Sequence, residues 1–93
     1  MVKRLGDLEI KRHLESLPGW VEVEGKLKKE YTFSNFVDAF AFMTRVAFLA
    51  EAMNHHPDWS NVYNRVLINL TTHDVGGITE IDFRFAESLE GIS

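Results

Sequence analysis

Three of the four histidines lie in two short segments that could form one catalytic site. His55 and His56 stand in E-A-M-N-H-H-P-D-W, and His73 stands in T-T-H-D-V-G-G. An imidazole has an unperturbed pKa of roughly 6.5, so it can donate and accept protons near neutral pH. Two imidazoles on opposite sides of a pocket would supply a general acid and a general base.

Neighbouring side chains could assist these histidines. Glu51 lies one helical turn before His55, so its carboxylate could orient or charge-stabilise that imidazole. A carboxylate near a helix C-terminus is otherwise slightly unfavourable, so its position is a mild indication of function. Pro57 and Trp59 could form an apolar wall for a flat ligand, and burial of Trp59 in the core is an equally good interpretation.

Other interpretations of these residues stay open. A pair of adjacent histidines in a loop is more often a surface feature than a catalyst. The side chains there that can ligate a metal ion are His55, His56, His73 and Asp74. Adjacent residues in an extended segment point to opposite sides, and no HExxH, His-x-His or cysteine accompanies them, so we expect no metal. Asp82 is interpreted as a capping-box carboxylate and His13 as solvent-exposed.

Composition restricts the class of protein. The 93 residues are 45% hydrophobic, and 14 acidic against 10 basic residues give a net charge of -4, which argues against direct nucleic-acid binding. Cysteine is absent, which excludes thiol chemistry. The N-terminus lacks the apolar region of a signal peptide, and no apolar run approaches the roughly 20 residues of a membrane span. We therefore expect one small cytoplasmic domain over residues 1–93 that makes no membrane contact.

Hydrophobic periodicity predicts the elements that position the histidines. Alternation and turn signals predict strands, and three- and four-residue spacing predicts helices. The expected order is a helix at Asp7–Leu17, strands at Trp20–Glu24 and Leu27–Phe33 around a Gly25-Lys26 turn, a helix at Asn35–Asn54, two strands within Val62–Thr72 that break near Tyr63-Asn64, and a helix opened by a capping box at Thr79–Asp82. This α-β-β-α-β-β-α order predicts an α+β fold, with a four-stranded antiparallel sheet and helices packed on one face.

The long helix at Asn35–Asn54 is apolar over an unusually wide arc. Its polar stripe is narrow and consists of Asp38, Thr44, Arg45 and Glu51. A helix that exposes so few polar residues has to be covered on two sides, and the sheet can cover only one of them. We therefore predict a homo-oligomer formed through this helix; a fully buried central helix in a monomer is the alternative.

The segment from Glu51 to Asp82 resembles the signature of the pterin-4a-carbinolamine dehydratases. The resemblance rests on E-x-x-x-H-H-P, on N-V-Y-N and on the later T-H-D, and it extends upstream to F-S-N-F-V-D-A-F-A-F-M, so it covers most of the chain. It implies the same α+β fold, assembled through the long helix into dimers and often tetramers. The implied activity is dehydration of 4a-hydroxytetrahydropterin to the quinonoid dihydropterin, in recycling of the tetrahydropterin cofactor of aromatic amino-acid hydroxylases, without metal or bound cofactor.

The resemblance also implies roles for individual residues. By position, His55 and His73 are assigned to proton transfer, His56 chiefly to holding the pterin, and Glu51 to orienting or charging His55. The other expected substrate contacts are Pro57, Asp58, Trp59, Thr72 and Asp74. One departure concerns the position before the paired histidines, which is acidic in some family members and is the neutral Asn54 here. Asn54 is instead expected to end the helix in the left-handed conformation.

A function of another class is the alternative. Some relatives act as binding, assembly or transcriptional-coactivator proteins through their helices, and the apolar arc of the long helix would suit such a role. The complete set of histidines favours an enzyme, because a scaffold does not need two loops of imidazoles.

Overall fold

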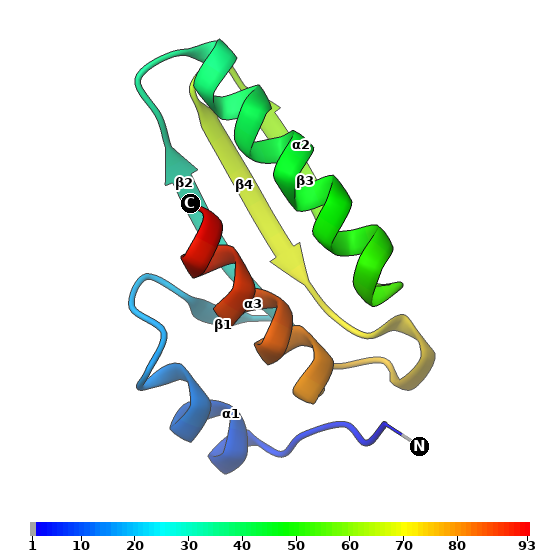
Figure 1. Cartoon of the computed structure of the whole chain (residues 1–93). Helices are drawn as coiled ribbons and strands as arrows, with labels where there is room; N and C mark the ends of the chain where they lie inside the picture. The colour runs from blue at the N-terminus through cyan, green and yellow to red at the C-terminus, as the bar shows by residue number, and fades with distance from the viewer. Residues whose placement is uncertain (1) are drawn as a thin grey trace.

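The expected order of elements is confirmed. The computed structural model describes residues 2–93 (Figure 1). Its elements are α1 (Asp7–Leu14), β1 (Val21–Val23), β2 (Lys26–Thr32), α2 (Phe36–Met53), β3 (Asp58–Val62), β4 (Arg65–Leu70), the 3-10 helix η1 (His73–Val75) and α3 (Glu80–Ile92). The strands form one antiparallel sheet in the order β1-β2-β4-β3. No helix within residues 2–93 is both long and apolar enough to cross a membrane.

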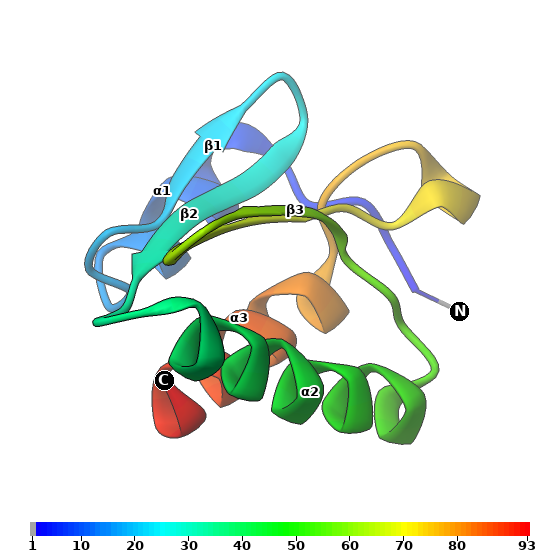
Figure 2. The same ribbon diagram turned by 90° about the horizontal axis from the view of Figure 1, so that it is seen from above.

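One face of the sheet carries the core. Alternate residues of β2 and β4 point to this face, and α2 and α3 cover it side by side (Figure 2). The buried strand residues are Leu27, Tyr31, Val66, Ile68 and Leu70, and the buried residues of α2 are Ala39, Phe42, Val46 and Ala50. The spacing of the buried α2 residues is that of one helix face, so the sheet covers only part of the apolar arc.

The two ends of α2 are fixed by asparagines. The side chain of Asn35 accepts a hydrogen bond from the backbone N–H of Asp38 at 2.8 Å, which caps the N-terminus. At the other end Asn54 has φ 51° and ψ 45°, the left-handed conformation expected from the sequence. The next residue, His55, donates its backbone N–H to Ala50 O at 3.0 Å, which closes the helix and directs the chain into the site.

The structure corrects several expected boundaries. β3 begins at Asp58, a segment that the sequence pattern left as loop, because only alternate residues of this edge strand face the helices. The hairpin turn is Glu24-Gly25, where both residues have positive φ, and Lys26 already belongs to β2. The first helix ends at Leu14 instead of Leu17. The short helix η1 was not expected.

His13, which the sequence predicts to be solvent-exposed, is exposed only in part. Its side chain is half-buried, and its ring stacks on that of Phe83 with centroids 4.5 Å apart. Its Nε2 lies 3.2 Å from a carboxylate oxygen of Glu80. These contacts attach α1 to the start of α3, a tertiary arrangement that the helical pattern of α1 alone could not indicate.

A second polar cluster attaches the C-terminal part of α3 to the sheet. One carboxylate oxygen of Glu90 accepts hydrogen bonds from Lys29 at 2.8 Å, from the Tyr31 hydroxyl and from the Trp20 indole N–H at 3.3 Å. Burial alone would raise the pKa of Glu90, but these hydrogen bonds and the charge of Lys29 outweigh it and hold that pKa below its ordinary value. Burial and the bond to Glu90 raise the pKa of Tyr31 far above its ordinary value.

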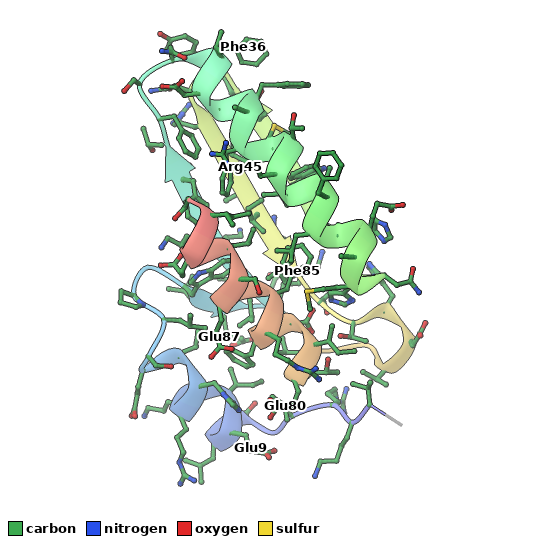
Figure 3. All side chains as sticks on the ribbon, viewed as in Figure 1. Glu9, Phe36, Arg45, Glu80, Phe85 and Glu87 are labelled. Carbon is green, nitrogen blue, oxygen red and sulfur yellow. The ribbon has the colours of Figure 1, made fainter. Side chains whose placement is uncertain are left out.

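Replacement of Glu90 should therefore weaken the fold in a pH-dependent way. A carboxylate whose pKa is lower in the folded state contributes stability that is complete above its ordinary pKa and is lost as the pH falls through the folded value. For Glu90→Gln we expect a loss of about 1–3 kcal/mol near neutral pH, measured by urea unfolding, that shrinks between about pH 5 and pH 3. Glu87→Gln, an exposed position on α3 labelled in Figure 3, is the matched control. A pH-independent loss, or an equal loss for both variants, would contradict this account.

Candidate active site

The predicted histidines meet in one cleft. It lies where the end of α2, the start of β3 and the loop after β4 converge, and it has a volume of about 310 Å³. Its lining residues are Asn54, His55, His56, Pro57, Asp58, Thr71, Thr72, His73 and Asp74. All the predicted site residues except Glu51 and Trp59 therefore line a single cleft.

His55 is held by a buried carboxylate that sequence reasoning assigned only to a helix cap. Its Nε2 lies 2.6 Å from Oδ1 of Asp82; the side chain of His55 is 12% exposed and that of Asp82 is 0% exposed. A carboxylate accepts, so this contact indicates an N–H on Nε2. The assignment leaves Nδ1 as the ring nitrogen that can exchange a proton with a molecule in the cleft.

The other oxygen of Asp82 belongs to the capping box of α3, as expected. Oδ2 accepts from the backbone N–H of Thr79 at 2.9 Å and from the Thr72 hydroxyl at 2.8 Å. The Thr79 hydroxyl lies 2.8 Å from that of Thr72, whose only proton is given to Asp82, so Thr79 donates to Thr72. The Thr79 hydroxyl also accepts the N–H of Ile81 at 3.2 Å, which completes the N-terminus of α3. Both carboxylate oxygens are thus satisfied without water.

Glu51 contacts a different histidine from the one expected. Its Oε2 lies 2.6 Å from Nε2 of His56, and it does not pair with His55 as predicted. The reason is the left-handed turn at Asn54, which turns His55 inward toward Asp82 and leaves His56 beside the last turn of α2. Both members of this pair are more than half exposed, so the ion pair itself adds little stability.

His73 is the most exposed of the three histidines. Its side chain is 71% exposed, and its Nε2 lies 3.8 Å from Oδ2 of Asp58, beyond hydrogen-bond distance. Lys26 Nζ lies 3.7 Å from the same oxygen. Asp58 therefore stands between a histidine and a lysine, and the electrostatics of this side of the cleft depend on all three groups.

Trp59 lies on the other side of β3 from the cleft. It pairs in register with the buried Ile68 and packs partly buried against the core, which matches the core interpretation weighed from the sequence. Its neighbour Asp58 points to the opposite face of the strand and lines the cleft. A contact between Trp59 and a ligand in this cleft stays a prediction.

Sequence reasoning missed Thr71 at the cleft, the approach of Lys26 to Asp58 and the second role of Asp82. Asp82 is 27 residues from His55, and its position in a capping box already explained it, so no local pattern indicated the contact. Within residues 2–93, no group of three or more His, Cys, Asp or Glu side chains could hold a metal ion.

Comparisons with known proteins agree with the resemblance noted from the sequence. The family described as pterin 4 alpha carbinolamine dehydratase matches residues 3–92. A protein from Solibacter usitatus is 52% identical over 93 residues, which covers 100% of this chain and 98% of the relative. A protein from Prochlorococcus marinus is 48% identical over 90 residues, which covers 97% of this chain and 94% of the relative. Both are provisionally named pterin-4-alpha-carbinolamine dehydratase.

A solved structure has the same fold. The crystal structure of a transcriptional coactivator/pterin dehydratase from Brucella melitensis is similar with a TM-score of 0.94 and 38% sequence identity. The match covers 97% of this chain and 98% of that one. The fold expected from the sequence is thus confirmed independently of the site.

The Asp82 contacts generate a prediction about stability. Asp82→Ala would leave the Thr72 hydroxyl, the Thr79 N–H and the half of the His55 ring that faces the interior without a partner. We expect a loss of about 2–4 kcal/mol in the free energy of unfolding, measured by urea denaturation at a fixed protein concentration. Asp58→Ala, which removes a half-exposed carboxylate from the same cleft, should change it by less than about 0.5 kcal/mol. Equal losses in the two variants would show that burial of Asp82 does not matter.

Proposed function

The chain belongs to the pterin-4a-carbinolamine dehydratase family, and we propose that it catalyses the dehydration of 4a-hydroxytetrahydropterin to the quinonoid dihydropterin by histidine acid/base catalysis. The observation that carries the proposal is the 2.6 Å contact between His55 Nε2 and the buried Asp82. This contact fixes one imidazole at the wall of a cleft that also carries His56 and His73.

The reaction needs one proton given and one proton taken. The C4a hydroxyl leaves as water when it is protonated, the N5 lone pair forms the C4a–N5 double bond, and the N5 proton is then lost to a base. The groups that exchange these protons therefore have to reach two adjacent atoms of one planar ring. No electrons are gained or lost overall, so the step needs no oxidant or reductant.

His55 and His73 fit these two roles by their different environments. His55 is nearly buried and has one ring nitrogen held by Asp82, which favours a fixed ring with Nδ1 toward the substrate. His73 is largely exposed, so it can exchange its proton with solvent between turnovers. The charge of Asp82 also stabilises the imidazolium that His55 becomes when it takes a proton.

The remaining cleft residues are proposed to bind the substrate. Glu51 pairs with His56, so it acts through His56, which holds the pterin, and not through His55. Carboxylates accept hydrogen bonds from ring and amino N–H groups, which a pterin carries along one edge. The proposed contacts at the cleft are Pro57, Asp58, Thr72 and Asp74. Recycling of a tetrahydropterin cofactor is the process that this reaction would serve.

The proposal is tested by stopped-flow kinetics with 4a-hydroxytetrahydropterin generated in situ. We expect wild-type protein to accelerate its ultraviolet decay, and the His55→Ala/His73→Ala double variant to lose at least about 100-fold in kcat. The control is His13→Phe, which removes the fourth histidine and keeps a ring stacked on Phe83. A folded wild-type protein that does not accelerate the decay would refute the dehydratase proposal. Full activity in the double variant would refute the assignment of the two histidines.

We also propose that two copies associate through the outer face of α2. Large apolar side chains are exposed there, with Val37 and Phe48 each 74% exposed and Phe40 55% exposed. Phe36, 48% exposed, continues this apolar face to the end of α2 remote from the cleft (Figure 3). It is unfavourable for one helix to expose so many large apolar side chains to water.

The spacing of this face suits a second copy of the same chain. Phe40 and Phe48 lie four residues on either side of Thr44. In an antiparallel helix pair with a two-fold axis at Thr44, each Phe40 would meet the Phe48 of the other copy. Binding of a different protein would not require this symmetric spacing of Phe40 and Phe48 about Thr44.

The cytoplasmic location and the lack of direct nucleic-acid binding stay predictions from the sequence.

Self-association is tested by sedimentation velocity at micromolar concentration. We expect wild-type protein to sediment as a dimer or tetramer and Phe48→Glu to shift toward the monomer, because a buried charge in the apolar pair is costly. Leu8→Glu, a 68% exposed leucine on α1, is the matched control and should not change the sedimentation coefficient. A monomeric wild-type protein would contradict self-association and leave this face to a different protein.

A further inference from the structure

His73 is positioned differently from His55. No hydrogen bond within residues 2–93 joins its side chain to another residue, and its approach to Asp58 is 3.8 Å. Its place therefore depends on the backbone of the loop that carries it. The two ends of this loop are paired at Thr72 and Gly77, which we call the neck. Thr72 N–H donates to Gly77 O at 2.8 Å, and Gly77 N–H donates to Thr72 O at 3.3 Å.

The inner side of the neck rests on the Asp82 cluster. The Thr72 hydroxyl donates to Asp82 and lies 2.8 Å from that of Thr79, and all three side chains are buried. The same carboxylate holds His55. On this side the neck is therefore fixed by Asp82 and Thr79.

The outer side of the neck rests on the N-terminal segment. Figures 1 and 2 show this segment running beside the loop that follows β4. The backbone N–H of Leu5 donates to Ile78 O at 2.8 Å, and the side chains of both residues are buried. Arg4 lies against Gly77 so closely that an added Cβ there would be 2.8 Å from Arg4 Cγ and closer still to Cδ. A side chain at position 77 would therefore require the stem of Arg4 to move.

We propose that Arg4 and Leu5 are positioning residues for His73, which they hold through the neck at Thr72–Gly77. Neither residue lines the cleft, so neither touches the substrate. The segment blocks outward movement of Gly77 and Ile78, and the Asp82 cluster blocks inward movement of Thr72. For its kinetic consequence the inference rests on the dehydration proposed above, because the position of His73 matters to the rate only if His73 transfers a proton.

The first test removes the Arg4 stem. Arg4→Ala should increase the amide hydrogen exchange of Val75, Gly76 and Gly77, and should lower kcat by about three- to tenfold with little change in KM, since small misplacements of a catalytic group act on the chemical step. Arg4→Lys keeps an aliphatic stem and should retain wild-type values. Arg12→Ala, which removes the same charge from an exposed position on α1, is the control. If Arg4→Ala behaves like Arg12→Ala in both measurements, the proposal is overturned.

The second test uses the close approach of Arg4 to Gly77. Gly77→Ala should displace Arg4 and reproduce the faster exchange and the lower kcat of Arg4→Ala. In the Arg4→Ala background the same change should have little further effect, because the stem that it displaces is already absent. Gly91→Ala, where an added Cβ meets nothing within 4 Å, controls for the substitution. An equal effect of Gly77→Ala in both backgrounds would refute the contact as the cause.

The two tests separate this inference from the proposed function. If wild-type protein shows no dehydration, the proposed function fails, and hydrogen exchange alone still decides whether Arg4 holds the neck. If dehydration occurs and exchange is faster in Arg4→Ala but kcat is unchanged, the neck is held but His73 does not need it, which overturns the positioning role.

Discussion

The buried carboxylate of Asp82 is the group on which the fold and the site both depend. A buried charge is costly unless its hydrogen bonds are complete, and here Oδ2 takes the Thr79 N–H and the Thr72 hydroxyl while Oδ1 takes His55. These partners come from the start of α3 and from the residues that follow β4 and α2. One group therefore starts a helix, fixes the neck of the His73 loop and orients an imidazole, so the geometry of the candidate site forms as part of folding.

The three histidines are held to different degrees, which suits different tasks. His55 has a buried partner and a single accessible nitrogen, His56 has an exposed carboxylate partner, and His73 depends on its loop. In the proposed reaction, a rigid group beside the substrate ring and a more exposed group in contact with solvent would take a proton at one atom and give one at another. His73 has no side-chain hydrogen bond within residues 2–93, so it is the histidine that the proposed support at Arg4 and Leu5 would position.

Much of this arrangement could be predicted from the sequence because it is local. The caps at Asn54 and Thr79 and the apolar arc of α2 each depend on residues within a few positions. The contacts that could not be predicted are tertiary ones. The pairing of Glu51 with His56 depends on the direction in which the Asn54 turn sends the chain, and the contact of Asp82 with His55 joins residues 27 positions apart. The start of β3 at Asp58 was missed because an edge strand with one helix-covered face has too few apolar residues to show alternation.

The central claim is that Asp82 holds His55 in one form, with a proton on Nε2 and Nδ1 toward the cleft. Long-range ¹H–¹⁵N NMR of the histidine rings in the wild-type protein tests it most directly, because the nitrogen shifts distinguish the two neutral tautomers. The account predicts that His55 carries its proton on Nε2 and that Asp82→Asn removes this preference. A neutral His55 ring protonated on Nδ1, with Nε2 bare beside Asp82, would contradict it.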